Sequence, residues 1–291
     1  FILPSQDTWI SSGSSTITGD TFKDQNFGQD EILELKKFFY NNQFDHQTRI
    51  LVQFNLTELS QSVANNTITN PKYFLRLYEA NGTQDLSTDY TIGAYPISQS
   101  WNEGRGKFTN NPKITTDCSW DNRIYPEGGS ATSWSKASGV SQHGVNFMST
   151  SIYQASQSFS YTTPDINMDV TNIVNRWLVS GSTISPNYGF LLKFSGSQET
   201  DNSTHAQLKF FSKQEIQQSA VESHSTSPFA SSLVSAKAED IKYPPSSVLC
   251  ILPFLPTESK YCFLHCSFPS ESVFINVAYQ NGLSPVKQNN K

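Results

Sequence analysis

Three oxygen-bearing residues have a spacing that could serve to bind a cation. Asp165, Asn167 and Asp169 are separated by two positions each, as at the start of a D-x-N-x-D calcium loop. No glycine follows at the place that an EF-hand loop requires. The favoured interpretation is therefore that Asp169 caps a helix and Asp165 begins a turn. We expect no metal and retain the three as calcium candidates.

Tryptophan and glutamate offer a second kind of chemistry. A sugar could stack on the indole of Trp101 beside Glu103. In the alternative interpretation, Trp101 anchors the core where a long loop begins, and Glu103 accepts hydrogen bonds from backbone amides. Trp120 and Trp134 lie in the same segment, from Ser98 to Gly139, which has little apolar periodicity. Loops of this length are often functional, so these four residues are the interface or glycan candidates.

The remaining reactive side chains do not form a catalytic pattern. No G-x-S-x-G or H-E-x-x-H motif accompanies the histidines. Cys262 and Cys266, with His265 between them, could suggest zinc, but their alternation with apolar residues favours small buried side chains, with a disulfide left open. We expect no enzyme activity, no catalytic residue and no cofactor. The histidines, interpreted as solvated loop residues, are His46, His143, His205, His224 and His265.

The composition favours half-buried strands. Aromatic residues make up 13% of the 291 residues and charged residues only 15%, with a net charge of −5. No basic run offers an electrostatic surface for nucleic acid, and no apolar run approaches the roughly 20 residues that span a bilayer. We therefore expect neither nucleic acid nor membrane as a partner. The chain begins at Phe1 without methionine, as expected of a fragment or of a chain that has lost a leader.

One helix and many short strands must position these residues. Val170, Ile173, Val174, Trp177 and Leu178 fall at the helical period and predict a short amphipathic helix between Asp169 and Gly181, with its apolar side inward over one end of a β core. The other segments predict an antiparallel, jelly-roll-like sandwich. We expect strands at residues 1–12, 32–40, 49–54, 72–80, 91–97, 147–152, 157–161, 190–194 and 206–211, and a helical turn at 55–59.

The predicted organisation has three parts: a sandwich at residues 1–212, a Ser-rich linker or irregular closing segment at 213–240, and a small second β module, whole or truncated, at 241–291. Within the sandwich, we expect Arg49 and Asp7 to form an ion pair or a network across strands.

Several phrases together resemble the DNRLRE family, a β-sandwich module of secreted bacterial proteins and of tailed-phage virion proteins. The resemblance covers roughly residues 1–211, and within the family it is closest to structural proteins of large myovirus-like particles. The phrases are Asp7-Thr8-Trp9-Ile10, Asn26-Phe27-Gly28, Arg49-Ile50-Leu51-Val52-Gln53-Phe54, Leu75-Arg76-Leu77, Ser100-Trp101-Asn102-Glu103-Gly104, Asp169-Val170-Thr171, Trp177 and Asn187-Tyr188-Gly189-Phe190.

This resemblance implies a non-enzymatic structural or assembly protein of a tailed-phage virion, at the neck, collar, tail or head surface. Its partners would be other virion proteins, bound in a symmetric homo-oligomer or in multiple copies, with the Ser98–Gly139 segment as the contact arm. The alternative is a carbohydrate-binding or adhesin module of a secreted, extracellular bacterial protein, which would bind a glycan.

Overall fold

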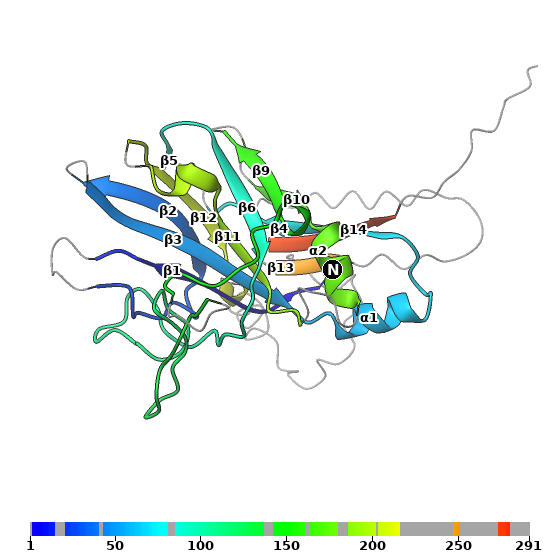
Figure 1. Cartoon of the computed structure of the whole chain (residues 1–291), viewed down its shortest axis with the longest axis horizontal. Helices are drawn as coiled ribbons and strands as arrows, with labels where there is room; N and C mark the ends of the chain where they lie inside the picture. The colour runs from blue at the N-terminus through cyan, green and yellow to red at the C-terminus, as the bar shows by residue number, and fades with distance from the viewer. Residues whose placement is uncertain are drawn as a thin grey trace, which may run out of the picture.

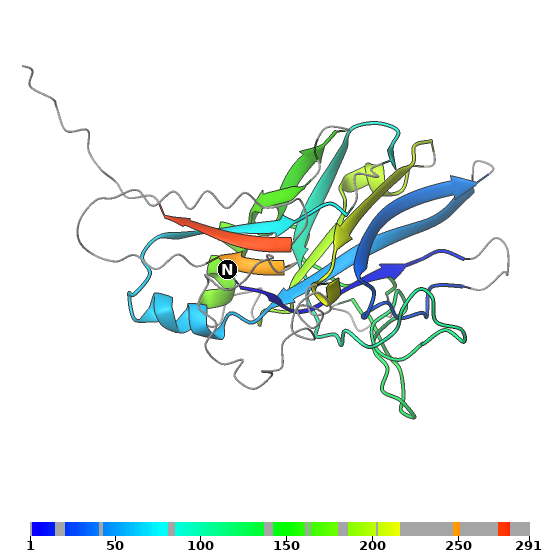
Figure 2. The ribbon, with the colours of Figure 1, turned by 180° about the vertical axis from the view of Figure 1, so that it is seen from behind.

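Two layers of mostly antiparallel strands make up the fold in Figures 1 and 2. The computed structural model describes residues 2–14, 21–40, 43–80, 85–136, 142–160, 163, 165–179, 186–201, 203–215, 247–250 and 273–279. The larger layer is an eight-stranded sheet in the order β5-β12-β2-β3-β11-β6-β9, with β1 also paired to β3. Its strands are β1 (Pro4–Ser11), β2 (Ile32–Tyr40), β3 (Gln43–Phe54), β5 (Asp85–Leu86), β6 (Tyr90–Pro96), β9 (Ala155–Phe159), β11 (Phe190–Phe194) and β12 (Ala206–Phe211).

The smaller layer has the order β10-β4-β14-β13, and all its pairings except the parallel β13–β14 pair are antiparallel. The all-β, sandwich-like fold predicted from the sequence is thus confirmed. The remaining elements are β4 (Pro71–Leu77), β7 (Asn122–Ile124), β8 (Thr132–Ser133), β10 (Ile166–Asp169), β13 (Ser247–Cys250), β14 (Val273–Tyr279), the helices α1 (Thr57–Ala64) and α2 (Thr171–Leu178), and the 3-10 turns η1 (Ser151–Tyr153) and η2 (Gly196–Glu199).

Alternation along the central strands separates two cores. Ile50 and Val52 of β3 and Leu192 of β11 belong to the larger core, which also includes residues of β4 and β10. Leu51 and Leu191, which pair with each other, belong to a second core on the opposite face. Because successive side chains of a strand point to opposite faces, the continuous apolar runs in β3 and β11 indicate burial on both sides.

The amphipathic helix lies as predicted. Trp177 of α2 is 8% exposed. Its ring centre lies 4.6 Å from that of Phe190, in an edge-to-face arrangement. Asp169 Oδ1 accepts the Thr171 N–H at 2.9 Å, so this carboxylate serves the first turn although Val170 holds the N-cap position. The helix ends at Leu178, and Gly181, expected just past its end, lies outside the described residues.

The long segment that begins at Ser98 packs its tryptophans against the outer face of the large sheet, while residues 126–132 between β7 and β8 are exposed. Its part as a contact arm stays a prediction. Figures 1 and 2 both show the segment running beneath β1 and β3. Trp101, Trp120 and Trp134 are 3%, 7% and 0% exposed and pack with Ile10, Leu51 and Leu191 in the second core. The absence of periodicity misled the sequence interpretation, because a few widely spaced indoles bury an irregular segment as effectively as regular structure does.

Other boundaries differ from the predictions. The strand expected at 147–152 is wrong: Phe147 forms one isolated bridge to Ile97, and η1 follows, with Ile152 61% exposed. The sequence analysis missed β10, where buried Ile166 and Met168 alternate over only four residues. The strand at 49–54 begins earlier, at Gln43, and the expected helical turn at 55–59 is the eight-residue helix α1.

Most of the C-terminal region lies outside the described residues, including Cys262, His265, Cys266 and His224. Within it, β14 pairs with β4 of the smaller layer. The division into a sandwich, a linker at 213–240 and a module at 241–291 stays a prediction.

Candidate functional site

The four interface or glycan candidates point inward. The Trp101 indole donates to the Tyr188 carbonyl at 2.9 Å, and the Trp134 indole donates to the Ser119 carbonyl at 3.0 Å. The Arg49 guanidinium lies 4.8 Å from the centre of the Trp120 ring. No indole of the three therefore presents a face on which a sugar could stack. This arrangement corrects the stacking interpretation of these residues and agrees with the alternative in which Trp101 is a core anchor.

The three calcium candidates each hold a protein partner. Asp165 Oδ1 accepts the Glu79 N–H at 2.9 Å, Asn167 Oδ1 accepts from Arg76 Nε at 3.1 Å, and Asp169 Oδ1 serves α2. Across the part of the chain that the structure describes, no group of three or more His, Cys, Asp or Glu side chains is placed to hold a metal. Asp165, Asn167 and Asp169 stay candidates on their sequence pattern alone.

Arg49 and Asp7 belong to different clusters, so the expected pair between them is wrong. Arg49 Nε donates to Glu199 Oε1 at 2.7 Å, and Lys193 Nζ lies 2.7 Å from Glu199 Oε2. Because Leu51 pairs with Leu191, Arg49 and Lys193 project side by side from the outer face of the sheet, and η2 brings Glu199 between them.

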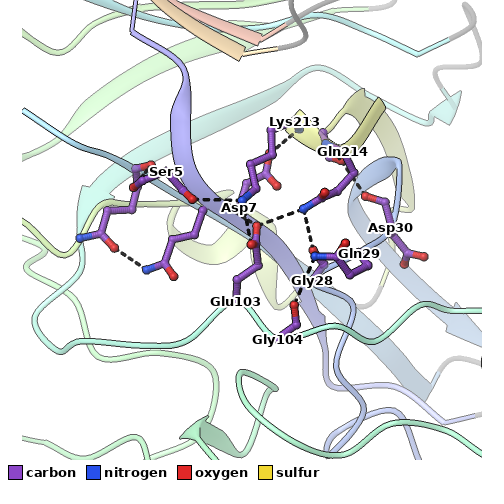
Figure 3. A network of polar contacts seen from close by, with 12 residues as sticks. Ser5, Asp7, Gly28, Gln29, Asp30, Glu103, Gly104, Lys213 and Gln214 are labelled. Atoms are coloured by element: carbon purple, nitrogen blue, oxygen red, sulfur yellow. Dashed lines mark hydrogen bonds and ion pairs between the residues drawn. The ribbon is translucent and has the colours of Figure 1, made fainter. Parts of the chain in front are cut away.

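A buried polar network surrounds Asp7, as Figure 3 shows. The Asp7 N–H donates to Glu103 Oε1 at 2.8 Å, and Asp7 Oδ2 accepts the Lys213 N–H at 2.8 Å. Lys213 Nζ lies 2.7 Å from Glu103 Oε2, and Gln214 Nε2 donates to the Gly28 carbonyl at 3.0 Å. Residues 213–214 are thereby fastened to β1 and to two loops. The expectation that Glu103 accepts backbone amide hydrogen bonds is confirmed.

Close packing of two sequence phrases builds this network. A Cβ on Gly28 would lie 2.1 Å from the Glu103 carbonyl oxygen, so only glycine fits there. The fully buried Asn26 amide donates to the carbonyls of Glu103 at 2.7 Å and Cys118 at 2.8 Å. The phrases Asn26-Phe27-Gly28 and Trp101-Asn102-Glu103-Gly104 thus meet in the interior, where they position loops.

Burial governs the protonation of this network. Desolvation, followed by repulsion from Glu103, raises the pKa of Asp7 to about 7, and desolvation also raises the pKa of Glu103. Asp7 is only 1% exposed, and its Oδ1 has no hydrogen-bond partner. A carboxyl group enclosed in this way has a structural part in the fold and no open route to a substrate.

The raised pKa of Asp7 predicts a pH-dependent stability. The folded state keeps a proton that the unfolded carboxyl, with its pKa of 3.8, releases. The free energy of unfolding should therefore fall as the pH rises from about 4 to about 7. Asp7→Asn should make this slope shallower and raise stability relative to the wild type above neutral pH, while the raised pKa values of Asp30 and Glu103 keep part of the slope. Urea unfolding at pH 5 and pH 8 measures both effects.

The surface variant Asp24→Asn, which alters an exposed pair with Lys113, is the control and should keep the wild-type slope. A wild-type slope that survives in Asp7→Asn would contradict this assignment.

A smaller hollow of about 190 Å³ contains three carboxylates, Asp30, Glu31 and Glu34. Desolvation raises the pKa of Asp30 to about 6, although Asp30 Oδ2 accepts the Trp9 indole N–H at 2.9 Å. Glu31 pairs with Lys107, and Glu34 lies 3.4 Å from Lys209 Nζ. All three carboxylates thus have protein partners.

Another hollow lies at the end of the sandwich where α1 and α2 stand next to each other in both Figure 1 and Figure 2. It has a volume of about 670 Å³, within the range of pockets for small ligands. We call it the end pocket. Its lining residues are Ser5, Gln53, Phe54, Asn55, Leu56, Thr57, Ser60, Gln61, Trp177, Leu178 and Asn187.

Part of the end pocket is held rigid by its own hydrogen bonds. Gln53 Nε2 donates to the Asn187 carbonyl at 2.7 Å, and Asn187 Nδ2 donates to the Phe54 carbonyl at 2.8 Å. Asn187 Oδ1 also accepts the Gly189 N–H at 2.9 Å. These bonds join the end of β3 to the start of β11, so the floor is fixed before any ligand arrives. The sequence analysis missed this pocket, because α1 and α2 are more than a hundred residues apart in the sequence and no local pattern joins them.

No described helix is long and apolar enough to cross a membrane. No curated protein matches the chain. Residues 1–125, which include β1 to β7 and α1, match the model of carbohydrate-binding module family 96 (CBM96), and this similarity covers less than half of the chain.

Proposed function

We propose that this chain binds carbohydrate and does not cleave it. The observation that carries the proposal is the match of residues 1–125 to carbohydrate-binding module family 96. The sandwich-like fold and the preformed, polar end pocket support it. The proposal corresponds to the second of the two functions expected from the sequence, and it includes a secreted or extracellular location, where such modules meet polysaccharides.

Virion assembly, the first function expected from the sequence, stays a prediction. The match to a carbohydrate-binding family favours glycan as a partner, and no comparison links the chain to a phage particle.

Affinity electrophoresis of the full chain tests the proposal. Native gels would contain soluble starch, xylan, galactomannan, laminarin, alginate or polygalacturonate, with bovine serum albumin as a reference. We expect at least one polysaccharide to retard the chain relative to albumin, and we expect no release of reducing ends from that polysaccharide. Unchanged mobility in every gel would overturn carbohydrate binding, and release of reducing ends would overturn the non-catalytic part.

A further inference from the structure

We infer that the polysaccharide binds at the smaller hollow beside Phe108, with one pyranose ring stacked on the Phe108 side chain. We call this hollow and the exposed ring at its rim the Phe108 site. The inference rests on the proposed function and adds the place of binding and the kind of sugar unit. The lining residues from Trp9 to Phe108 lie within the part matched to the carbohydrate-binding family, and Lys209 joins them. The end pocket, in contrast, includes Trp177 and Asn187 from beyond that part.

Phe108 is the outermost ring of an aromatic cluster. Its ring centre lies 6.3 Å from that of Trp9, 6.4 Å from that of Phe27 and 5.8 Å from that of Phe22. Trp9 and Phe27 are buried and stack on each other at 3.9 Å, whereas Phe108 is 54% exposed. One side of the cluster therefore belongs to the core, and the Phe108 ring reaches the surface. An aromatic ring in this position offers an apolar face on which the C–H face of a sugar can pack.

Hydrogen bonds fix the backbone that carries this ring. The Phe108 N–H donates to Asp30 Oδ1 at 3.0 Å, and Asp30 Oδ2 accepts the Trp9 indole N–H at 2.9 Å. Gln25, which is 3% exposed, donates from Nε2 to the Lys107 carbonyl at 3.2 Å. Because these bonds already hold the loop, little conformational entropy is lost when a sugar packs on the ring.

Charged side chains of the hollow can bind the hydroxyls of the same sugar. Lys209 of β12 and Glu34 of β2 are partners across the strand pair, and Lys209 Nζ lies 3.4 Å from Glu34 Oε1. The two side chains are 35% and 22% exposed, so water and ligands can reach them. A carboxylate has about four acceptor positions and an ammonium group has three donors, so each keeps hydrogen-bonding capacity beyond the ion pair.

The size of the hollow suits one unit of a polymer. Its volume of about 190 Å³ is below the roughly 300 Å³ at which pockets for whole small ligands begin. We therefore expect the polymer to pass along the surface with one ring over Phe108. A pyranose chair presents a flat patch of axial C–H groups to an aromatic ring, whereas a furanose ring is smaller and puckered. The Phe108 site is thus expected to take pyranose polymers and to reject furanose polymers.

Affinity gels and titrations of the full chain and its variants test this inference. The pyranose polymers are starch, xylan, galactomannan, laminarin, alginate and polygalacturonate, and inulin is the furanose polymer. Phe108→Ala should weaken binding of each retarding pyranose polymer by about tenfold, because the stacking surface is lost. Phe108→Trp keeps an aromatic face and should bind at close to the wild-type level. Lys209→Ala should weaken binding by about threefold to tenfold, the effect of one lost hydrogen bond.

Phe38→Ala is the matched control, because it makes the same change at another surface phenylalanine. Phe38 is 41% exposed on β2 and does not line the hollow. Gln61→Ala is a second control, placed in the end pocket. Both controls should bind as the wild type does. An unchanged thermal midpoint in Phe108→Ala would show that its loss of binding does not come from unfolding, and Lys209→Ala keeps the test valid if that midpoint falls.

The outcomes separate the inference from the proposed function. Weaker binding in Phe108→Ala and Lys209→Ala, with Phe108→Trp and both controls unchanged, supports the Phe108 site. Unchanged binding in Phe108→Ala, or an equal loss in Phe38→Ala or Gln61→Ala, would overturn the site and leave the proposed function intact. Retardation by inulin and by none of the pyranose polymers would overturn the sugar class. If no polymer retards the chain, the proposed function itself fails.

Discussion

Replacement of Glu199 with glutamine is expected to lower the free energy of unfolding by about 3–5 kcal/mol, the usual cost of removing one partner of a buried ion pair. The Glu199 side chain is 6% exposed, and it is the carboxylate that serves both Arg49 and Lys193, whose side chains are 11% and 8% exposed. Glutamine would leave two cations close together on the outer face of the sheet. Burial already lowers the pKa of Lys193, and Glu199 opposes this effect.

Chemical denaturation of Glu199→Gln against the wild type measures the loss. The control makes the same substitution in an exposed pair, Arg105 with Glu127, where the side chains are 68% and 77% exposed. Glu127→Gln should change the free energy of unfolding by less than about 1 kcal/mol, because water screens such pairs. Equal effects of the two substitutions would contradict a supporting role for the buried triad.

Trp134→Ala should lower the free energy of unfolding by a similar amount, about 3–5 kcal/mol, because it leaves a cavity in the second core. Trp134 is fully buried in the second core and holds the covering segment to the sheet, with its indole bonded to the Ser119 carbonyl. Cys118 lies in the same core, 0% exposed, where burial raises the pKa of its thiol well above the usual value. The variant should therefore also open this thiol to reaction.

Denaturation reports the loss of stability, and alkylation followed by mass spectrometry of the peptide with Cys118 reports the opening. Phe108→Ala is the comparison, because Phe108 lies in the same segment but is 54% exposed. It should cost less than about 1 kcal/mol and leave Cys118 protected. A Trp134→Ala chain that stays as stable as Phe108→Ala, with Cys118 unreactive, would show that the covering segment is not a core layer.

Local patterns were sufficient to predict the strands and the helix whose buried residues recur at a regular spacing. The stripe from Val170 to Leu178 predicted α2 with Trp177 inward, and the continuous run from Phe190 to Phe194 predicted a strand, which the structure buries on both faces. Periodicity carried no information on the partner of Lys193, because Glu199 comes from a polar turn outside the strand. A lysine within an apolar strand was itself the signal that a buried acid had to lie nearby.

The candidate site could be predicted only in part. Trp101 and Glu103 were recognised as informative residues, but their sequence does not state whether an indole faces water or a sheet. The outer face of β3 and β11 had to be covered, and the tryptophan segment covers it. The end pocket combines α1 with Trp177 and Asn187, more than a hundred residues apart in sequence, so only the folded chain brings its lining together.

Hydrogen exchange with and without a bound neutral polysaccharide tests the central claim most directly, since it locates the carbohydrate on the folded chain. We expect slower exchange in a group of peptides that come together on one exposed surface of the folded chain, because a bound polymer covers a continuous surface. Slower exchange confined to residues 98–136, where Trp101, Trp120 and Trp134 lie, would contradict this account. Exchange that stays the same throughout the chain at saturating polysaccharide would contradict it as well.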